Sequence, residues 1–486
     1  MKLSELLNQD DYIVINGSVD VEITDIVYDS RKACAGCVFV CLKGAAADGH
    51  RFAQTAVTKG AAAVVASEDI TLSGAVLVKV CDTRRALALM SAAFFDYPAK
   101  ELTTIAITGT KGKTTTSYMI HAIMEKASVK TGVIGTIGIV IGDKLIKTPN
   151  TTPESYEIQH ALRQMADAGC SCAVMEASSL GLKAHRVDGI VFDYGLFTNF
   201  SHDHIGGDEH ESLDDYRRSK ALLFKICRHG VFNMDDSSAA FMMDGCSCTV
   251  TTFGFNKDAD YMASNDKLFS KNGCLGVHFD LGGRLDLSID VNIPGKFNVY
   301  NALGALAVCI ETGAPPRAVL NGLSTVKVRG RVERVDIPNA PYTLLIDYAH
   351  NAVSMESLLT VLREYKPKRL ITVFGAGGNR PRDRRFEMGE ISGRLSDLSV
   401  ITEDNSRMED VMNILADIET GLKRTDGQYI VIPDRTDAIK WCLENGREGD
   451  IIVLAGKGHE DYQDKDGKKT HYDEREVIAN LIKARL

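Results

Sequence analysis

The sequence predicts an α/β protein of three domains, and three observations support this prediction. The chain has 486 residues, which allows about three domains at roughly 150 residues each. Its composition is ordinary for a globular protein, with 44% hydrophobic and 25% charged residues. Short apolar, β-rich runs recur, and each ends in a loop of Gly, Asp, Asn, Thr or His. They are TIAIT (104–108), CAVME (172–176), YTLLID (342–347), RLITVF (369–374) and IIVLAG (451–456).

Helix-like segments follow several of these runs, an alternation typical of parallel strands joined by crossover helices. We expect a first domain at 1–100, with short strands and many Ala and Gly residues. A second domain at 101–333 holds a Gly-rich loop and most histidines, and a third at 334–486 holds another alternating set. Ligands bind beyond the carboxyl ends of parallel strands, so polar clusters just after the apolar runs are the candidate sites.

Charge and the N-terminus exclude several classes of protein. The chain has 56 Lys and Arg against 65 Asp and Glu, a formal net charge of −9. This disfavours broad binding to nucleic acid or to anionic membrane surfaces. The N-terminal MKLSELLNQDDYIV does not look like a signal peptide, and no apolar run reaches the roughly 18 residues of a membrane span. We therefore expect a cytoplasmic protein with reduced cysteines and no membrane insertion.

A Gly-rich loop follows the first of the apolar runs. Residues 104–116 read TIAITGTKGKTTT, and a helix-like SYMIHAIMEKA comes next. Glycine lets the backbone approach phosphate closely, and a helix N-terminus offers free N–H groups to an anion. Lys113 can reach outer phosphates, and the Thr114 hydroxyl can bind Mg²⁺. Ile107 stands where the usual loop has its first glycine. The pattern predicts nucleotide binding, with a structural Gly-rich turn as the alternative.

Three further side chains are candidates in the second domain. Glu176 and His204 each lie at or just past the end of a predicted strand, which suggests a metal site. The alternative is that Glu176 caps a helix and His204 is a turn residue. Lys220 shares a helical face with Leu223 and Phe224. A lone lysine is nevertheless more often a solvated surface residue, and the sequence alone favours that interpretation.

Two further groups of residues lie later in the chain. Asn298 and Asn301 in GKFNVYNA are three residues apart on one helical face. Their amides can contact an adenine edge or cap a helix. Arg331 follows a turn glycine in VRGRVER, and Asp347 and His350 lie at a strand end in LIDYAHN.

Three separate strand ends in the last third deliver Arg380, then Asn405 with Arg407, and then Glu460. Arginine forms bidentate pairs with carboxylates, while Glu and Asn can pair with an ammonium group. This set suits an amino acid that carries extra charged groups. A solvated basic loop is the alternative for the other arginines in GAGGNRPRDRR.

Many motifs occur together in one order: YDSRKACAGCVFV, TGTKGKTTT, NTTPE, MEASS, TNFSHDH, GKFNVYNALGA, VRGRVE, DYAHNAVSMESLL, GAGGNR, DNSR and AGKGHEDY. Over nearly its whole length the chain resembles the Mur ligases, ATP-dependent amide-forming enzymes of peptidoglycan synthesis, and most closely those of the MurE type. The resemblance implies an N-terminal UDP-sugar-binding domain, a central P-loop ATPase domain and a C-terminal Rossmann-like domain for the incoming amino acid.

The resemblance also implies roles for individual residues. The expected ATP-binding residues are Gly109, Thr110, Lys111, Gly112, Lys113, Thr114, Thr115, Asn298, Arg331, Asp347 and His350. Contacts to the UDP-sugar are expected from Ser30, Thr151, Thr152, Ser178 and Arg186. The expected Mg²⁺ ligands are Thr114, Glu176, His204 and Lys220. Lys220 corresponds to the lysine that the family carbamylates with CO₂. Lys113, Glu176, His204 and Lys220 form the expected catalytic set. The amino acid is expected to meet Arg380, Asp404, Asn405, Arg407, Gly456 and Glu460.

The implied substrates are ATP, UDP-N-acetylmuramoyl-L-alanyl-D-glutamate and a diamino acid, joined through an acyl phosphate. Family members that add meso-diaminopimelate carry D-N-P-R, and this chain has DNSR at 404–407. Arg407 can pair with the second carboxylate that diaminopimelate has and lysine lacks. We therefore favour meso-diaminopimelate, with L-lysine or ornithine as alternatives, and expect a monomer.

Other functions remain open from the sequence. The related ligases folylpolyglutamate synthase and cyanophycin synthetase are alternatives that the DSR segment (29–31) and DNSR argue against. A non-catalytic nucleotide-binding regulatory paralogue is a further alternative. The presence of Lys113, Glu176, His204 and Lys220 argues against it.

Overall fold

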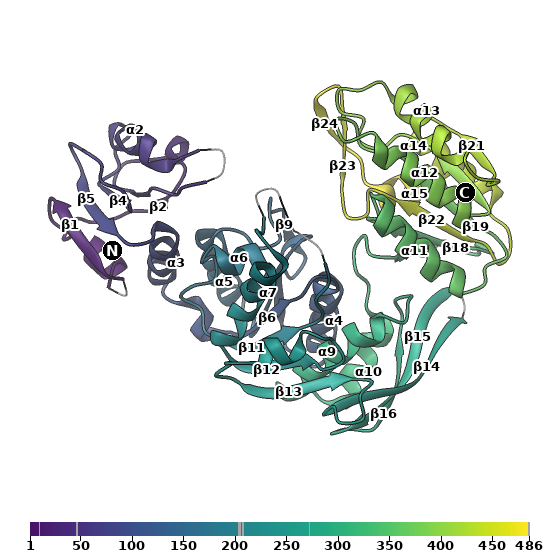
Figure 1. Ribbon diagram of the computed structural model, residues 1–486, viewed down its shortest axis with the longest axis horizontal. Helices are drawn as coiled ribbons and strands as arrows, with labels where there is room; N and C mark the ends of the chain where they lie inside the picture. Colours follow the sequence, from purple (N-terminus) through teal and green to yellow (C-terminus); the bar gives the residue numbers. More distant parts are fainter. Residues whose placement is uncertain (9, 45–46, 203–205, 207–208, 272, 485–486) are drawn as a thin grey trace. The chain divides into compact units, whose positions relative to one another are not determined.

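The computed structural model describes the chain except for residues 9, 45–46, 203–205, 207–208, 272 and 485–486 (Figure 1). It divides into two compact units. One comprises 1–262 with 303–322, and the other comprises 263–302 with 323–486. Within the described ranges, no helix is both long enough and apolar enough to cross a lipid bilayer.

The first unit begins with a small sheet whose described strands follow the order β1-β5-β4-β3-β2. All are parallel except β1, which pairs antiparallel with β5. The strands are β1 (Tyr12–Asn16), β2 (Ile26–Val27), β3 (Val38–Val40), β4 (Ala63–Ala66) and β5 (Val76–Val80). The helical segments are α1 (Leu3–Leu6), η1 (Ser30–Lys32), η2 (Gly49–Phe52), α2 (Ala53–Thr58), α3 (Thr83–Phe94) and η3 (Pro98–Glu101). Successive residues of β3 point to opposite faces of the sheet, and Val38 and Phe39 belong to different hydrophobic clusters, so both faces of this sheet are buried.

A second sheet forms the centre of the first unit, in the order β13-β12-β11-β6-β10-β7-β8-β9. The strands from β13 to β7 are parallel, and β8 and β9 add an antiparallel edge. They are β6 (Thr103–Thr108), β7 (Thr131–Gly135), β8 (Gly138–Ile141), β9 (Lys144–Ile146), β10 (Cys172–Glu176), β11 (Phe192–Phe197), β12 (Cys227–Asn233) and β13 (Thr249–Gly254). The accompanying helices are α4 (Lys113–Lys126), α5 (Ser155–Asp167), α6 (Ser179–Lys183), α7 (Leu213–Ala221), η4 (Leu222–Lys225) and α8 (Ala239–Met243). The central strand β6 leads directly into the Gly-rich loop and α4.

The chain then passes from the first unit to the second. The segments here are β14 (Tyr261–Lys271), β15 (Cys274–Gly283), β16 (Leu287–Val291), α9 (Asn298–Glu311) and α10 (Pro316–Thr325). The division between the units falls inside β14 and again inside α9 and α10. In the second unit, β15 and β16 form an antiparallel pair.

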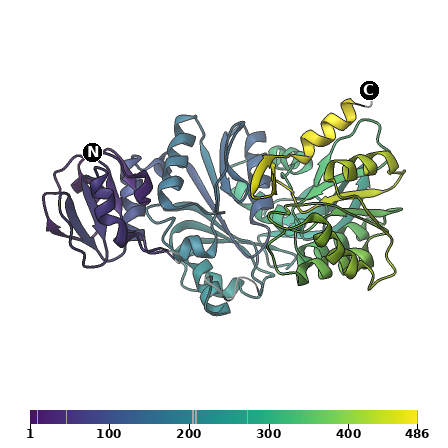
Figure 2. The same cartoon turned by 90° about the horizontal axis from the view of Figure 1, so that it is seen from above.

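The second unit also holds a sheet in the order β17-β18-β22-β19-β20-β21, parallel except for β17. Its strands are β17 (Glu333–Val335), β18 (Thr343–Asp347), β19 (Leu370–Phe374), β20 (Leu398–Ile401), β21 (Tyr429–Val431) and β22 (Ile451–Ala455). The helices are α11 (Ala352–Glu364), α12 (Asp383–Leu395), α13 (Val411–Leu422), α14 (Arg435–Asn445) and α15 (Glu474–Lys483). Helices α11, α12 and α13 contribute to the hydrophobic cluster on one face, and α14 and α15 to the cluster on the other. Helix α15 is the yellow helix that leads to the end marked C in Figure 2.

The five apolar runs of the sequence form β6, β10, β18, β19 and β22, so the predicted parallel α/β architecture is confirmed. A hairpin of β23 (Tyr462–Lys465) and β24 (Lys468–His471) follows β22. The carboxyl ends of β18, β19, β20 and β22 carry most of the candidate residues of the second unit.

Candidate functional site

The Gly-rich loop between β6 and α4 has a backbone that requires glycine. Gly109 has φ +151° and Gly112 has φ +88°, and a Cβ on Gly109 would lie 1.9 Å from Thr198 Oγ1. Helix α4 begins at Lys113, directly after the second glycine. Its first-turn N–H groups, including that of Thr115, therefore face the loop, which is the arrangement that binds anions.

Two ammonium groups converge on one carbonyl oxygen of this loop. Lys113 Nζ donates to the carbonyl oxygens of Gly109 (2.7 Å) and Thr110 (3.2 Å). Lys220 Nζ, from α7, donates to the same Gly109 oxygen at 2.9 Å and lies 4.2 Å from the Tyr216 ring centroid. The Lys113 ammonium group beside this loop can offset the negative charge of a bound phosphate group.

Lys220 is buried, with 1% of its surface exposed. The expectation from the sequence alone, a solvated surface lysine, is therefore wrong. The predicted helix is confirmed as far as Ala221, where α7 ends, while Leu223 and Phe224 lie on the following 3-10 segment η4. A buried ammonium needs a polar partner, and here the Gly109 carbonyl and the face of Tyr216 provide the contacts.

Side chains after β11 hold the phosphate loop in shape. Asn199 accepts from the Lys111 N–H and donates to the Lys111 carbonyl, both at 2.9 Å. Thr198 Oγ1 also donates to that carbonyl, at 2.8 Å. The sequence analysis gave neither side chain a role. Both follow β11, the strand that pairs with β6, and this position is the feature that could have identified them.

Glu176, the last residue of β10, is buried within a set of hydroxyl groups. Its Oε2 accepts from the Thr114 and Thr136 hydroxyls, at 2.9 and 3.0 Å, and its Oε1 accepts from the Thr136 N–H at 3.0 Å. The helix-capping alternative for Glu176 is wrong, because the Ser178 side chain caps α6. Thr136 was missed by the sequence analysis, although it follows β7, the neighbour of β10.

The oxygen atoms of Thr114 and Glu176 fit a magnesium ion. Mg²⁺ prefers a few carboxylate and hydroxyl oxygens together with phosphate oxygens, and these two side chains meet beside the first turn of α4. The predicted third ligand, His204, lies outside the described residues.

Replacing Thr136 with valine removes one hydroxyl while keeping the shape of the side chain. We expect the Mg²⁺ concentration for half-maximal activity to rise about tenfold, because outer-shell partners orient a metal-binding carboxylate. Thr131→Val is the matched control, since Thr131 is the first residue of β7, the strand that leads to Thr136, and its hydroxyl donates to the Val129 carbonyl instead. Equal metal requirements for the two variants would contradict this role for Thr136.

Four of the five predicted UDP-sugar residues lie together beyond β10. The Thr152 hydroxyl lies 3.0 Å from Ser178 Oγ, and Arg186 Nη1 donates to the Thr152 carbonyl at 2.9 Å. Thr151 Oγ1 lies 3.1 Å from Thr136 Oγ1, which links this group to the Glu176 hydroxyl set. Two arginines converge on Glu154 here, and a cavity of about 480 Å³ lies beside α6.

The fifth residue, Ser30, is on η1 beside the N-terminal sheet. Its carbonyl accepts from Lys59 Nζ at 2.9 Å.

In the second unit, Arg331, Asp347 and His350 gather around Tyr348. Both oxygens of Asp347 accept from backbone N–H groups, and burial raises the pKa of this carboxyl group. His350 Nδ1 lies 2.9 Å from the Tyr348 carbonyl oxygen. The Arg331 guanidinium lies 5.4 Å from the centroid of the Tyr348 ring.

The two asparagines predicted on one helical face are in direct contact. Asn298 is the first residue of α9 and donates to the Pro294 carbonyl at 2.7 Å. Asn301 Nδ2 donates to Asn298 Oδ1 at 2.8 Å. These bonds link the two amides to each other and to the segment before α9; helix capping and contact with adenine both stay predictions.

The amino-acid candidates meet at the carboxyl ends of β20 and β22. Asn405 Nδ2 donates to Glu460 Oε2 at 2.9 Å. Lys457, which the sequence analysis missed, donates to Asn405 Oδ1 at 3.1 Å and lies 3.3 Å from Asp404 Oδ1. Gly456 has φ +114°, and a Cβ there would lie 3.0 Å from Asp404 Oδ2, so the position is tight against that carboxylate.

Two of the predicted arginines flank the loop after β19. A Cβ on Gly377 would lie 3.1 Å from Arg407 Nη1 and 3.8 Å from Arg380 Cγ. Arg407 donates to the Gly378 carbonyl and has φ +53°, a conformation that non-glycine residues seldom adopt. Arg380 is exposed. The loops after β19, β20 and β22 therefore bring the predicted basic and acidic groups together.

The surroundings of Glu460 predict that kcat/KM for the amino-acid substrate depends on pH. Burial, and next the charge of Asp404, raises its pKa above the ordinary 4.5. Only the ionised carboxylate can attract an ammonium group, so protonation on acidification removes this interaction. We expect kcat/KM for a diamino-acid substrate to fall with decreasing pH at values above 4.5, and Glu460→Gln to lose this limb. The same limb in kcat/KM for ATP would assign it to another group.

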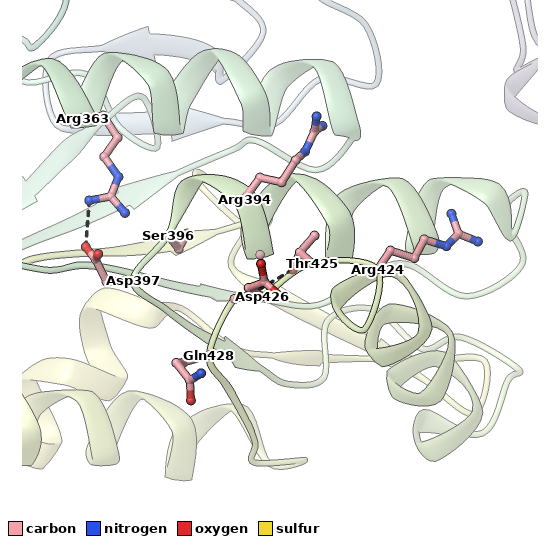
Figure 3. Close-up of a pocket in the computed structure, with 10 residues that line it drawn as sticks. Arg363, Arg394, Ser396, Asp397, Arg424, Thr425, Asp426 and Gln428 are labelled. Atoms are coloured by element: carbon pink, nitrogen blue, oxygen red, sulfur yellow. Dashed lines mark hydrogen bonds and ion pairs between the residues drawn. The ribbon is translucent and has the colours of Figure 1, made fainter.

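A cavity of about 540 Å³ lies elsewhere in the C-terminal sheet (Figure 3). Its lining includes Asp397 and Gln428, which directly precede β20 and β21, so it is at the opposite strand ends from the candidate site. Arg363 donates to Asp397 at 2.8 Å within it, while Arg394 and Arg424 point away from this pair. It contains none of the predicted site residues.

Comparison with known proteins gives three family matches along the chain. The Mur ligase family catalytic domain matches residues 22–97, the Mur ligase middle domain 107–309 and the Mur ligase glutamate ligase domain 330–458. A UDP-N-acetylmuramoyl-L-alanyl-D-glutamate–2,6-diaminopimelate ligase of Clostridium botulinum is 41% identical over 99% of this chain and 100% of its own. One from Caldanaerobacter subterraneus is 41% identical over 96% of both chains.

A solved structure described as a UDP-N-acetylmuramoyl-L-alanyl-D-glutamate–2,6-diaminopimelate ligase is similar throughout. It has a TM-score of 0.73 and 28% identity, and the match covers 100% of this chain and 99% of the other. The three-domain α/β architecture predicted from the sequence is thereby confirmed. With relatives about 40% identical over their full length, the chain belongs to the Mur ligase family, of the MurE type.

Proposed function

We propose that the protein is an ATP-dependent ligase that adds meso-diaminopimelate to UDP-N-acetylmuramoyl-L-alanyl-D-glutamate in peptidoglycan precursor synthesis. The observation that carries the proposal is the group at the ends of β19, β20 and β22, where the Arg407 guanidinium donates to the Gly378 carbonyl and the Glu460 carboxylate accepts from Asn405, the neighbour of Ser406 and Arg407 in the motif. A substrate with one carboxylate and one ammonium group at its far end complements this pair. The names of the relatives agree with this substrate.

The first unit supports the phosphoryl-transfer half of the reaction. In our proposal the carboxylate of the D-glutamate end takes the γ-phosphoryl group of ATP, giving an acyl phosphate and ADP. Lys113 and the first-turn N–H groups of α4 hold the phosphates, and this positioning supplies most of the rate enhancement. Thr114 and Glu176 would hold Mg²⁺, which would offset the negative charge that builds up on the phosphate oxygens. The amine of the diamino acid then attacks the acyl carbon, and phosphate leaves.

Lys220 is proposed to act as a carbamate, as the family resemblance implies. Its ammonium group would first lose a proton, and the amine would then add to CO₂ and release a second proton, which replaces a buried cation with an anion. The position of Lys220 supports this proposal, because its Nζ lies beside the phosphate loop, 2.9 Å from the Gly109 carbonyl oxygen. Protein incubated with ¹³C-bicarbonate should show a carbamate carbon signal that is absent from Lys220→Met. An identical spectrum for both proteins would overturn this assignment.

The remaining assignments are also proposals. Ser30, Thr151, Thr152, Ser178 and Arg186 would bind the UDP-sugar substrate, and the Asn298, Arg331, Asp347 and His350 side chains would contact ATP. We place the domain boundaries near residues 101 and 333, and propose a cytoplasmic monomer.

The test of the proposed function is phosphate release with ATP, Mg²⁺ and UDP-N-acetylmuramoyl-L-alanyl-D-glutamate. Meso-diaminopimelate, L-lysine and L-ornithine are compared, and a reaction without amino acid is the control. Release that depends on diaminopimelate supports the proposal. A preference for lysine would retain the ligase but reject the substrate. No turnover with any of the three would favour a regulatory paralogue.

A further inference from the structure

Lys457 is a completely buried lysine at the end of β22, with 0% of its surface exposed. Its Nζ donates to Asn405 Oδ1 at 3.1 Å and to the Tyr462 carbonyl at 3.0 Å. Asp404 Oδ1 lies 3.3 Å from the same nitrogen. Burial alone would raise the pKa of Asp404, but the charges of Lys457 and Arg435 outweigh it and lower the pKa. Lys457 is thus a buried cation that faces an ionised partner.

These contacts determine which way the Asn405 amide points. Its Oδ1 accepts from Lys457 Nζ and from the backbone N–H of Asp464, at 3.1 and 3.0 Å. Both of these groups can only donate. Its Nδ2 donates to Glu460 Oε2, and an ionised carboxylate can only accept. The three partners therefore agree on one orientation of the amide, and the rotated form would place like groups against each other at all three.

We infer that Lys457 is a positioning residue that makes Asn405 a hydrogen-bond donor toward the amino-acid substrate. This rests on the proposed function. Both acceptor sites of Asn405 Oδ1 are used inside the protein, so this side chain cannot accept from a substrate ammonium group. The second N–H of Nδ2 has no acceptor among the described residues and suits a carboxylate oxygen. Asn405 thereby joins Arg407 in binding the distal carboxylate, and of Asn405 and Glu460 only Glu460 is left to bind the ammonium group.

The assignment changes what the sequence predicted for Asn405. From residue types alone, Asn and Glu were both expected to pair with an ammonium group. An amide can accept or donate, and the sequence does not show which of its ends is used. The buried cation decides this, because it holds the amide oxygen. Specificity for a substrate with two carboxylates then depends on Lys457 although this lysine does not face the ligand.

Asn405→Asp tests the direction of the hydrogen bond. The aspartate keeps the size of the side chain and an acceptor for Lys457, but it removes both N–H donors. We expect KM for meso-diaminopimelate to rise at least about tenfold, as expected for a lost hydrogen bond to a charged group, with a smaller change for L-lysine. If Asn405 instead accepted from the ammonium group, the added negative charge would lower KM or leave it unchanged. That result overturns the inference.

Lys457→Met tests the positioning role itself. Made together with Asp404→Asn, it removes the cation without leaving an unpaired buried charge. We expect the kcat/KM ratio of diaminopimelate to lysine to fall at least about tenfold relative to Asp404→Asn alone, while KM for ATP stays within about twofold. Lys465→Met is the matched control, since this lysine lies nearby on β23 and pairs with Glu403. An unchanged ratio overturns the inference.

The wild-type assay distinguishes a failure of the positioning role of Lys457 from a failure of the proposed function. If the wild type uses diaminopimelate and the ratio is insensitive to Lys457, only the positioning role fails. If the wild type uses no diamino acid, the proposed function fails and the inference fails with it. Thermal unfolding of each variant, compared with its own background, identifies any loss that comes from misfolding.

Discussion

Gly135→Ala should reduce Mg²⁺-dependent phosphate release about 100-fold. A Cβ at this position would lie 2.2 Å from Glu176 Oε1 and 2.7 Å from its Cδ, so the carboxylate must move. Glu176 is buried and held by Thr114 and Thr136, and it cannot shift without losing those bonds. A misplacement of about 1 Å in a phosphoryl-transfer site typically costs about 100-fold in rate. Phosphate release at several Mg²⁺ concentrations measures the effect.

Gly44→Ala is the control for this substitution. Among the described residues, the atom nearest to its new methyl group would be the Ala47 carbonyl oxygen at 3.4 Å, an ordinary contact distance. We expect this variant to retain wild-type activity. Near-normal turnover and an unchanged Mg²⁺ requirement in Gly135→Ala would show that the position of Glu176 does not govern phosphoryl transfer.

Arg407→Ala should lower kcat/KM for meso-diaminopimelate about 100-fold and leave that for L-lysine nearly unchanged. The guanidinium can form two charge-assisted hydrogen bonds with the distal carboxylate, which lysine lacks. Sites built for a charged group discriminate strongly against analogues without it. Initial rates with both amino acids measure the ratio.

The backbone at residue 407 needs its own control. Arg407 has φ +53°, where alanine stays strained and glycine does not. Arg407→Gly should therefore lose as much activity with diaminopimelate as Arg407→Ala. Recovery in the glycine variant would trace the loss to the backbone. Arg424→Ala, in the cavity at the opposite strand ends, removes the same charge and should behave as wild type.

The sequence by itself was sufficient to predict five of the buried strands and the candidate residues at strand ends. Apolar β-rich runs predicted β6, β10, β18, β19 and β22, because buried parallel strands have few polar positions. The loop at 109–114 was predicted because its glycines, its lysine and the following helix are local in the chain. The ends of parallel strands share an edge, so Glu176 and Asn405 could also be predicted as site residues.

The tertiary structure decided which partner each polar group has. The sequence favoured a solvated Lys220, yet packing of α7 against the loop buries it on the Gly109 carbonyl. Thr136 is 40 residues from Glu176, and only the pairing of β7 with β10 brings them together. Lys457 orients Asn405 across 52 residues. Propensity and periodicity act over a few residues, whereas burial and hydrogen bonding of charges depend on contacts between distant segments.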